Sequence, residues 1–184
     1  MLALALAFAV AAHGSQTRKG TQVPYVSHLL QVSGLVLEHG GDGEQAAALL
    51  HDVVEDTAAT IEEVAASFGA GVAAIVADCT DTGPGEAPGA KRAWIDRKRE
   101  YVAHLRGVSA RSALIVGCDK LHNMRSLVAD LEALGPGVLT RFNAPPEQQR
   151  WLHGELLAAL RDKVPPRVYA ELAGLCERYA ALTA

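Results

Sequence analysis

Apolar side chains recur every three or four residues along most of this chain, a spacing that predicts amphipathic helices. Residues 25–39 show it most clearly, at positions Val26, Leu29, Leu30, Val32, Leu35 and Val36. Pro24 suits the first turn of this helix, and Gly40-Gly41 would end it.

The same spacing predicts eight further helices, separated by turn-forming residues. We expect them at residues 2–13, 44–56, 60–69, 70–80, 92–105, 110–134, 147–161 and 166–182. Thr60 to Glu63 form a capping box, which places the start of one of them. Residues 81–90 hold three Gly and two Pro, so we expect an exposed loop there.

Composition supports an all-α fold. The chain of 184 residues has 33 Ala and 23 Leu against three Phe and four Ile, which favours helix over sheet. At this length one domain is the default, with a core large enough to be stable without disulfides.

Charge and cysteine content exclude several classes of protein. With 17 basic and 21 acidic residues the net charge is −4, so a broad basic surface that grips nucleic acid is not expected. Cys79, Cys118 and Cys176 are far apart and form no CxxC pair, which fits a reducing cytoplasm. The apolar residues 1–12 are too short to span a bilayer and follow no positive charge, so we expect a core helix and no membrane attachment.

The helix predicted over 44–56 carries the densest cluster of polar residues. His51 lies four positions before Glu55, and Asp52 four positions before Asp56, which places an imidazole and three carboxylates on one helix face. The three carboxylates on such a face repel one another unless a cation or bound protons compensate their charge. A solvated acidic helix end would show the same sequence pattern. A bound metal ion is the simplest compensation.

Two residues elsewhere extend this cluster. His28 lies one helix earlier, and Asp119 ends the apolar run 113–118, where an unpaired carboxylate would be costly. Together with His51 and Asp52 they would form a site of two nitrogens and two carboxylates, with positions left for water and substrate. Mn²⁺ or Fe²⁺ suits this ligand set, and Zn²⁺ suits it less well.

With these residues the chain resembles the HD-superfamily hydrolases of the RelA/SpoT type, most closely their single-domain small alarmone hydrolases. The motifs that carry the resemblance are His13-Gly14-x-Gln16-x-Arg18-Lys19-Gly20-Thr21-x-x-Pro24-Tyr25-x-x-His28, Ala48-Leu49-Leu50-His51-Asp52-x-Val54-Glu55-Asp56, Trp94-x-x-Arg97-Lys98-x-x-Tyr101 and Asp119-Lys120-Leu121-His122-Asn123-x-Arg125. The resemblance implies one HD-domain helical bundle over 1–184, with a metal-site core at about 9–131 and C-terminal helices at 138–184 packing on it.

This family resemblance also implies an activity. A Mn²⁺-dependent pyrophosphohydrolase would remove the 3′-diphosphate of guanosine tetra- or pentaphosphate through a metal-bound water, giving GDP or GTP and pyrophosphate. Glu55 is the first choice for the group that orients this water or takes its proton, with Asp56 as its partner; the sequence does not rank the two independently. In 184 residues we expect no additional synthetase domain.

Several residues are candidates for binding the nucleotide. Arg18 and Lys19 precede the His28 helix and would meet the base and phosphates. Lys98 is the candidate for the diphosphate, although a solvated basic helix face would explain it equally well. The resemblance further suggests contacts to the nucleoside from Asn123, Ser126 and Tyr25, of which packing alone would explain the last two.

Two rival functions stay open. A related phosphatase would act on another nucleotide, such as the 2′-phosphate of NADPH or an adenosine analogue of the alarmones, with the same metal site. A non-catalytic helical module would bind nucleotide without turning it over, and would be expected to lack a ligand or Glu55 or Asp56. The sequence leaves the oligomeric state open.

Overall fold

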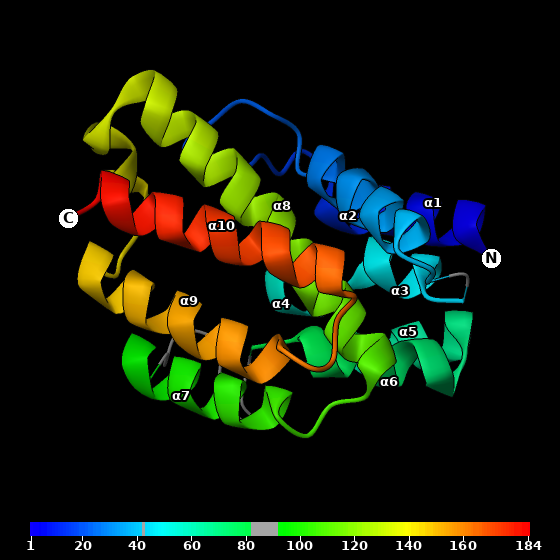
Figure 1. The fold of residues 1–184 in the computed structure, drawn as a ribbon. Helices are drawn as coiled ribbons and strands as arrows, with labels where there is room; N and C mark the ends of the chain where they lie inside the picture. Colours follow the sequence, from blue (N-terminus) through cyan, green and yellow to red (C-terminus); the bar gives the residue numbers. More distant parts are fainter. Residues whose placement is uncertain (42, 82–91) are drawn as a thin grey trace.

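The structure is a computed structural model that describes residues 1–41, 43–81 and 92–184, and it confirms the all-α prediction (Figure 1). Within these ranges the chain forms ten α-helices and one 3-10 helix, and no β-strand. The helices are α1 (Leu2–His13), α2 (Val26–Glu38), α3 (Gln45–Leu50), α4 (Val53–Asp56), α5 (Ile61–Phe68), α6 (Ala70–Cys79), α7 (Trp94–Leu105), α8 (Ala110–Leu134), η1 (Pro136–Arg141), α9 (Pro146–Leu160) and α10 (Pro166–Leu182).

The long helix α8 is the centre of the fold. It packs against α2 and α6, which precede it in the chain, and against α10, which follows it. Helix α10 lies between α8 and α9 (Figure 1). Helix α7 covers the other side of α9. Ile115 and Leu121 of α8 are fully buried, as are Leu29 of α2 and Leu50 of α3. In this core α2 contacts both α3 and α8, and α6 packs against α3 and α8 as well. His28 lies on α2 and Asp119 on α8, whereas His51 and Asp52 directly follow the end of α3.

The helix predicted over 44–56 is not continuous, which corrects the sequence-based expectation. Helix α3 ends at Leu50 and α4 begins at Val53, with a turn at His51 and Asp52 between them. His51 Nδ1 lies 2.7 Å from the carbonyl oxygen of Ala48, the group that would accept from the Asp52 N–H in an uninterrupted helix. The imidazole therefore competes with the backbone, and the cluster is presented from a turn instead of one helix face.

The 81–90 segment also differs from expectation where the structure describes it. Asp81 was predicted in an exposed loop, but its side chain is only 4% exposed because it is ion-paired with residues of α7. The rest of that prediction, residues 82–90, lies outside the described residues. After Gly135, where a break was expected, the chain forms the 3-10 helix η1.

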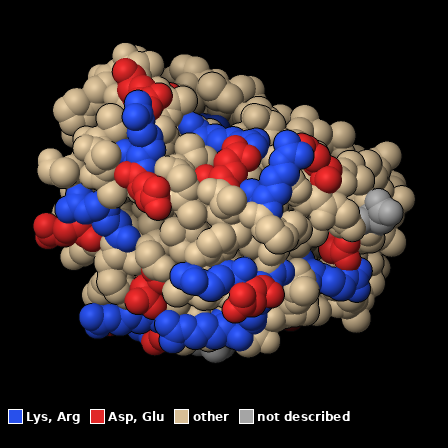
Figure 2. Space-filling view, viewed as in Figure 1, with Lys and Arg blue, Asp and Glu red and all other residues tan. Residues whose placement is uncertain are grey.

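The predicted capping box is confirmed. The Thr60 side chain accepts from the Glu63 N–H at 3.2 Å, and the Glu63 side chain accepts from the Thr60 N–H at 2.9 Å, which completes the capping box of α5. Among the described helices, none is long and apolar enough to cross a bilayer. On the face shown in Figure 2, basic side chains lie among acidic ones and form no continuous basic area.

Candidate metal centre

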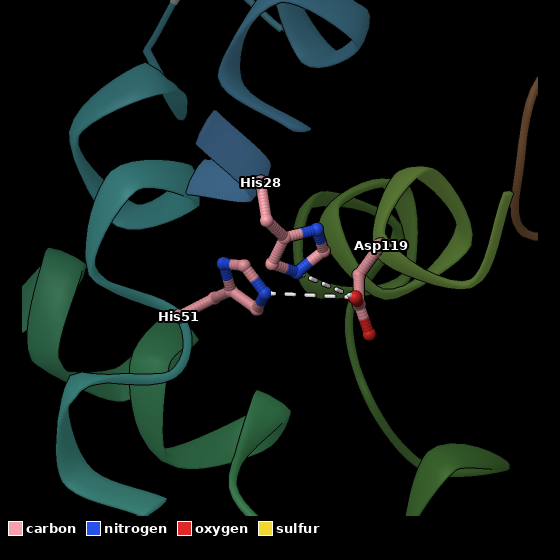
Figure 3. A group of neighbouring side chains, drawn as sticks. All are labelled: His28, His51 and Asp119. Carbon is pink, nitrogen blue, oxygen red and sulfur yellow. Dashed lines mark ion pairs between the residues drawn. The ribbon is translucent and has the colours of Figure 1, made fainter. Parts of the chain in front are cut away.

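The four predicted metal ligands lie together, although they come from separate parts of the fold. His28 Nε2 of α2 lies 3.2 Å from Asp119 Oδ1 of α8, and His51 Nε2 lies 3.6 Å from the same oxygen (Figure 3). Asp52 Oδ2 lies 3.4 Å from His28 Nε2 and 3.0 Å from His51 Nε2. The ligand atoms of His28, His51 and Asp119 all lie within 4.8 Å of one another, close enough to share one metal ion.

The two imidazoles are oriented as metal ligands require. His51 Nδ1 faces the Ala48 carbonyl at 2.7 Å, and because a carbonyl only accepts, this nitrogen carries a proton and Nε2 is the nitrogen left to bind a metal ion. His28 Nδ1 is engaged by His122 Nδ1 at 2.7 Å. Both Nε2 atoms are buried and have no hydrogen-bond partner among the described residues. Two such nitrogens facing two carboxylates fit a divalent transition metal.

The electrostatics of the cluster also favour a cation. Burial alone would lower the pKa of His51, but the Asp52 and Asp119 carboxylates together outweigh it and hold that pKa well above its usual value. Burial would raise the pKa of Asp119, but the Lys120 ammonium and the nearby imidazoles hold that pKa well below its usual range. The carboxylates are therefore ionised, and a metal ion replaces a proton when it binds His51.

Three residues predicted to bind substrate also hold the metal ligands in place. The Tyr25 hydroxyl donates to Asp52 Oδ2 at 2.6 Å, and burial together with the Asp52 charge raises the pKa of this phenol, which keeps it a donor. The Asn123 amide donates to Asp119 Oδ1 at 2.6 Å. Arg18 donates in turn to the Asn123 carbonyl oxygen, and its guanidinium lies 5.6 Å from the centre of the Tyr25 ring.

A pocket of about 120 Å³ opens beside the cluster. Glu55 and Asp56, the predicted catalytic carboxylates, both line it. Burial, followed by the charge of Asp52, raises the pKa of Glu55 above its usual value. A carboxylate in this environment holds a proton more readily than an exposed one, which is useful in a group that accepts a proton.

The lining of the pocket also contains basic side chains. Lys98, predicted from the sequence, lines the pocket and is ion-paired with Asp81. Lys120 lines it too, and its ammonium donates to Asp119 Oδ2 at 2.7 Å. Sequence reasoning assigned no site role to Lys120 or Asp81. Lys120 lies inside the motif that begins at Asp119, whereas nothing in the sequence indicates that Asp81 is buried.

Three predicted substrate residues do not line the pocket: Arg18, whose contacts are given above, Lys19 and Ser126. Lys19 lies over the Phe142 ring, with its ammonium 6.0 Å from the ring centre. The Ser126 hydroxyl donates to the His122 carbonyl oxygen one turn earlier in α8, at 3.1 Å. Within the described residues the Lys19 and Ser126 side chains have local structural contacts of their own.

Several known proteins are similar to this chain. The family model for the HD domain matches residues 5–136. The guanosine-3′,5′-bis(diphosphate) 3′-pyrophosphohydrolase MESH1 of Xenopus tropicalis is 38% identical over 126 residues, 65% of this chain and 65% of the relative. MESH1 of Drosophila melanogaster is also 38% identical over 126 residues, 66% of each chain. The match therefore spans about two thirds of the length of these curated relatives.

A solved structure has a similar fold over nearly the whole chain. It is described as a metazoan orthologue of SpoT that hydrolyses ppGpp, and it is 30% identical with a TM-score of 0.74. The match covers 95% of this chain and 92% of that one. The similarity therefore includes the C-terminal helices that lie beyond the family model.

Proposed function

We propose that this chain, which belongs to the HD-domain family, hydrolyses the 3′-diphosphate of guanosine tetra- or pentaphosphate to GDP or GTP and pyrophosphate. The observation that carries the proposal is the shared pocket, where the cluster of His28, His51, Asp52 and Asp119 adjoins two further carboxylates and a lysine. The names of the two MESH1 relatives and the description of the SpoT orthologue support the same substrate.

The HD family implies a divalent metal, and the cluster fits one. We propose Mn²⁺, held by two imidazoles and two carboxylates, with Fe²⁺ or Zn²⁺ as alternatives. When bound, such an ion polarises a phosphoryl oxygen and lowers the pKa of water from about 16 to as little as about 7.

The residues of the pocket divide the remaining work. Glu55 takes the proton from the attacking water, because its raised pKa lies closer to neutral pH than that of an ordinary carboxylate. Asp56 lines the same pocket and assists in orienting the water. Tyr25 and Asn123 hold the oxygens of Asp52 and Asp119 that face the imidazoles.

The size of the pocket suggests how the substrate lies. About 120 Å³ is well below the roughly 300–1,000 Å³ that encloses a whole drug-sized ligand, so we place only the diphosphate inside. Lys98 would bind the diphosphate there. The nucleoside would extend over the rim towards Arg18 and Asn123, with Lys19 and Ser126 as more distant contacts.

We further propose that residues 1–184 act as one HD domain in a reducing cytoplasm. The core at about 9–131 carries the metal site, and α9 and α10 pack on α7 and α8. Cys79, Cys118 and Cys176 are all free thiols, which fits a reducing compartment.

The test is release of pyrophosphate from guanosine tetraphosphate by the purified protein, with Mn²⁺ and after chelation. We expect Mn²⁺-dependent formation of GDP and pyrophosphate, lost in Asp52→Ala and retained in the exposed control Asp96→Ala. NADPH as a parallel substrate separates the phosphatase alternative, which would release inorganic phosphate. Nucleotide binding without turnover of either substrate would point to the sensing module and contradict the proposal.

A further inference from the structure

Asp81 connects two residues that the proposed function assigns to different tasks. It follows the end of α6, and its Oδ2 oxygen accepts from the ammonium of Lys98 on α7. Arg97 Nη1 lies 3.5 Å from the same oxygen. The backbone N–H of Asp81 donates to Glu55 Oε2 at 3.2 Å. One residue thus contacts the candidate anion-binding lysine with its side chain and the candidate base with its main chain.

The contact with Asp81 leaves Lys98 able to bind an anion. Two cations share one carboxylate, so the set of Asp81, Arg97 and Lys98 keeps a net charge of +1, although only Asp81 and Lys98 line the pocket. A lysine ammonium has three donors, and the contact with Asp81 uses one of them. Asp81 therefore restrains Lys98 without consuming its capacity to bind an anion.

Restraint matters because of the chemistry of lysine. A lysine side chain is a point charge on a flexible four-carbon stem, and ordering it costs rotamer entropy. The Lys98 side chain is 20% exposed, whereas that of Asp81 is 4% exposed, so the anchor is more rigidly enclosed than the group it holds. A lysine held in place before the substrate arrives does not pay that ordering cost on binding.

We propose that Asp81 is a positioning residue for the hydrolysis proposed above, on which this inference rests. Its carboxylate holds the Lys98 ammonium at the wall of the pocket, where the remaining N–H donors bind the substrate diphosphate. Its backbone N–H holds one oxygen of Glu55. Loss of the carboxylate should therefore weaken substrate binding more than the chemical step.

The variant Asp81→Asn tests this separation, because it removes the charge and keeps the backbone N–H to Glu55. We expect KM for guanosine tetraphosphate to rise about tenfold with a smaller change in kcat, a loss of the size given by one hydrogen bond to a charged group. Asp96→Asn is the matched control, since it removes a carboxylate from an exposed pair with Arg99 on the same helix, 3.7 Å apart. Mn²⁺ binding of both variants should match the unaltered protein, which shows that the fold is retained. Asp81→Asn should unfold at a somewhat lower temperature, because Arg97 and Lys98 lose their carboxylate partner.

A double-mutant cycle with Lys98→Met distinguishes positioning from general disruption. If Asp81 acts through Lys98, Asp81→Asn should add little to the KM effect in a chain that already carries Lys98→Met. Additive effects on KM, or an unchanged KM in Asp81→Asn, would overturn the inference while the proposed hydrolysis stands.

A binding measurement keeps the two proposals separable. Mn²⁺-loaded protein, dialysed free of excess metal, is titrated with inorganic pyrophosphate in a calorimeter. We expect Asp81→Asn and Lys98→Met each to weaken binding about tenfold relative to the unaltered protein and Asp96→Asn. Equal pyrophosphate affinity in Asp81→Asn and the unaltered protein would contradict the positioning role. Absence of turnover in the unaltered protein would contradict the proposed function alone.

Discussion

The two walls of the pocket are built in different ways. On the wall of the proposed metal ligands, each ligand has a contact of its own: His122 for His28, Ala48 for His51, Tyr25 for Asp52 and Asn123 for Asp119. On the wall formed by Asp81 and Lys98, the single carboxylate of Asp81 holds Lys98 and also Arg97, which does not line the pocket. The first arrangement holds each ligand separately, whereas the second leaves flexible side chains that one substitution can release.

The difference follows from what each wall has to bind. A metal ion needs ligand atoms at closely defined distances, which buried groups with separate hydrogen bonds can supply. A diphosphate carries its charge over several oxygens, so point charges on flexible stems suffice if they start near the right place. Substitutions on the two walls should therefore differ in kind: metal binding and kcat on one side, KM on the other.

The largest effect should come from a metal ligand. Asp119→Asn keeps the size of the side chain but removes the charge that faces both imidazoles. We expect loss of Mn²⁺ binding and a fall in kcat/KM of at least about a thousandfold, since the metal supplies several kcal/mol of transition-state stabilisation. Calorimetric Mn²⁺ titration measures the loss of binding, and pyrophosphate release measures the fall in kcat/KM. Asp130→Asn is the control. Unaltered metal binding in Asp119→Asn would remove this residue from the ligand set.

Glu55→Gln should come next, with the metal retained. A general base contributes about 10²- to 10⁴-fold, so kcat should fall by that factor while Mn²⁺ binding persists. Because burial and the Asp52 charge raise the pKa of Glu55, the unaltered enzyme should lose activity as the pH falls through that raised value. At saturating Mn²⁺ this acid limb should disappear in Glu55→Gln. If Glu55→Gln still lost activity at low pH, another group would be responsible for that loss. The pH profile of Asp56→Asn would show whether that group is Asp56.

A support of the metal-ligand wall should have a smaller effect. Tyr25→Phe removes the hydroxyl that donates to Asp52 at 2.6 Å and keeps the ring. Loss of such a partner costs about 10- to 100-fold in metal affinity. Competition with a metal-binding dye measures the affinity. If Tyr25→Phe changed KM and left metal affinity intact, the hydroxyl would act on the substrate instead.

The smallest effect should come from the wall formed by Asp81 and Lys98. Lys98→Met keeps most of the stem and removes the charge, so we expect about a tenfold rise in KM with little change in metal affinity. Steady-state kinetics at several salt concentrations measures it, and the KM of the variant should depend less on salt because a charge has been lost. A fall in Mn²⁺ affinity would show that the two walls are coupled, and would contradict their separate effects on metal binding and on KM.

Local sequence determined most of the secondary structure. Helices α1, α2, α5, α8 and α10 begin and end within about two residues of their predicted bounds. Those bounds depend on Gly, Pro and capping residues next to the helices themselves, such as the Thr60–Glu63 box. The residues that gather in the candidate metal centre could be selected from the sequence for a related reason, because buried imidazoles and carboxylates in apolar segments need a partner.

Only the tertiary structure decided how these groups meet. The break after Leu50 depends on the His51 ring reaching the Ala48 carbonyl in a packed environment, a choice that periodicity does not reveal. Asp81 contacts Glu55 across 26 positions and Lys98 across 17, so its burial is a consequence of how α6 and α7 lie near α4. Sequence determines which groups need partners because that is a property of each side chain; which partner each group finds depends on distances that only packing sets.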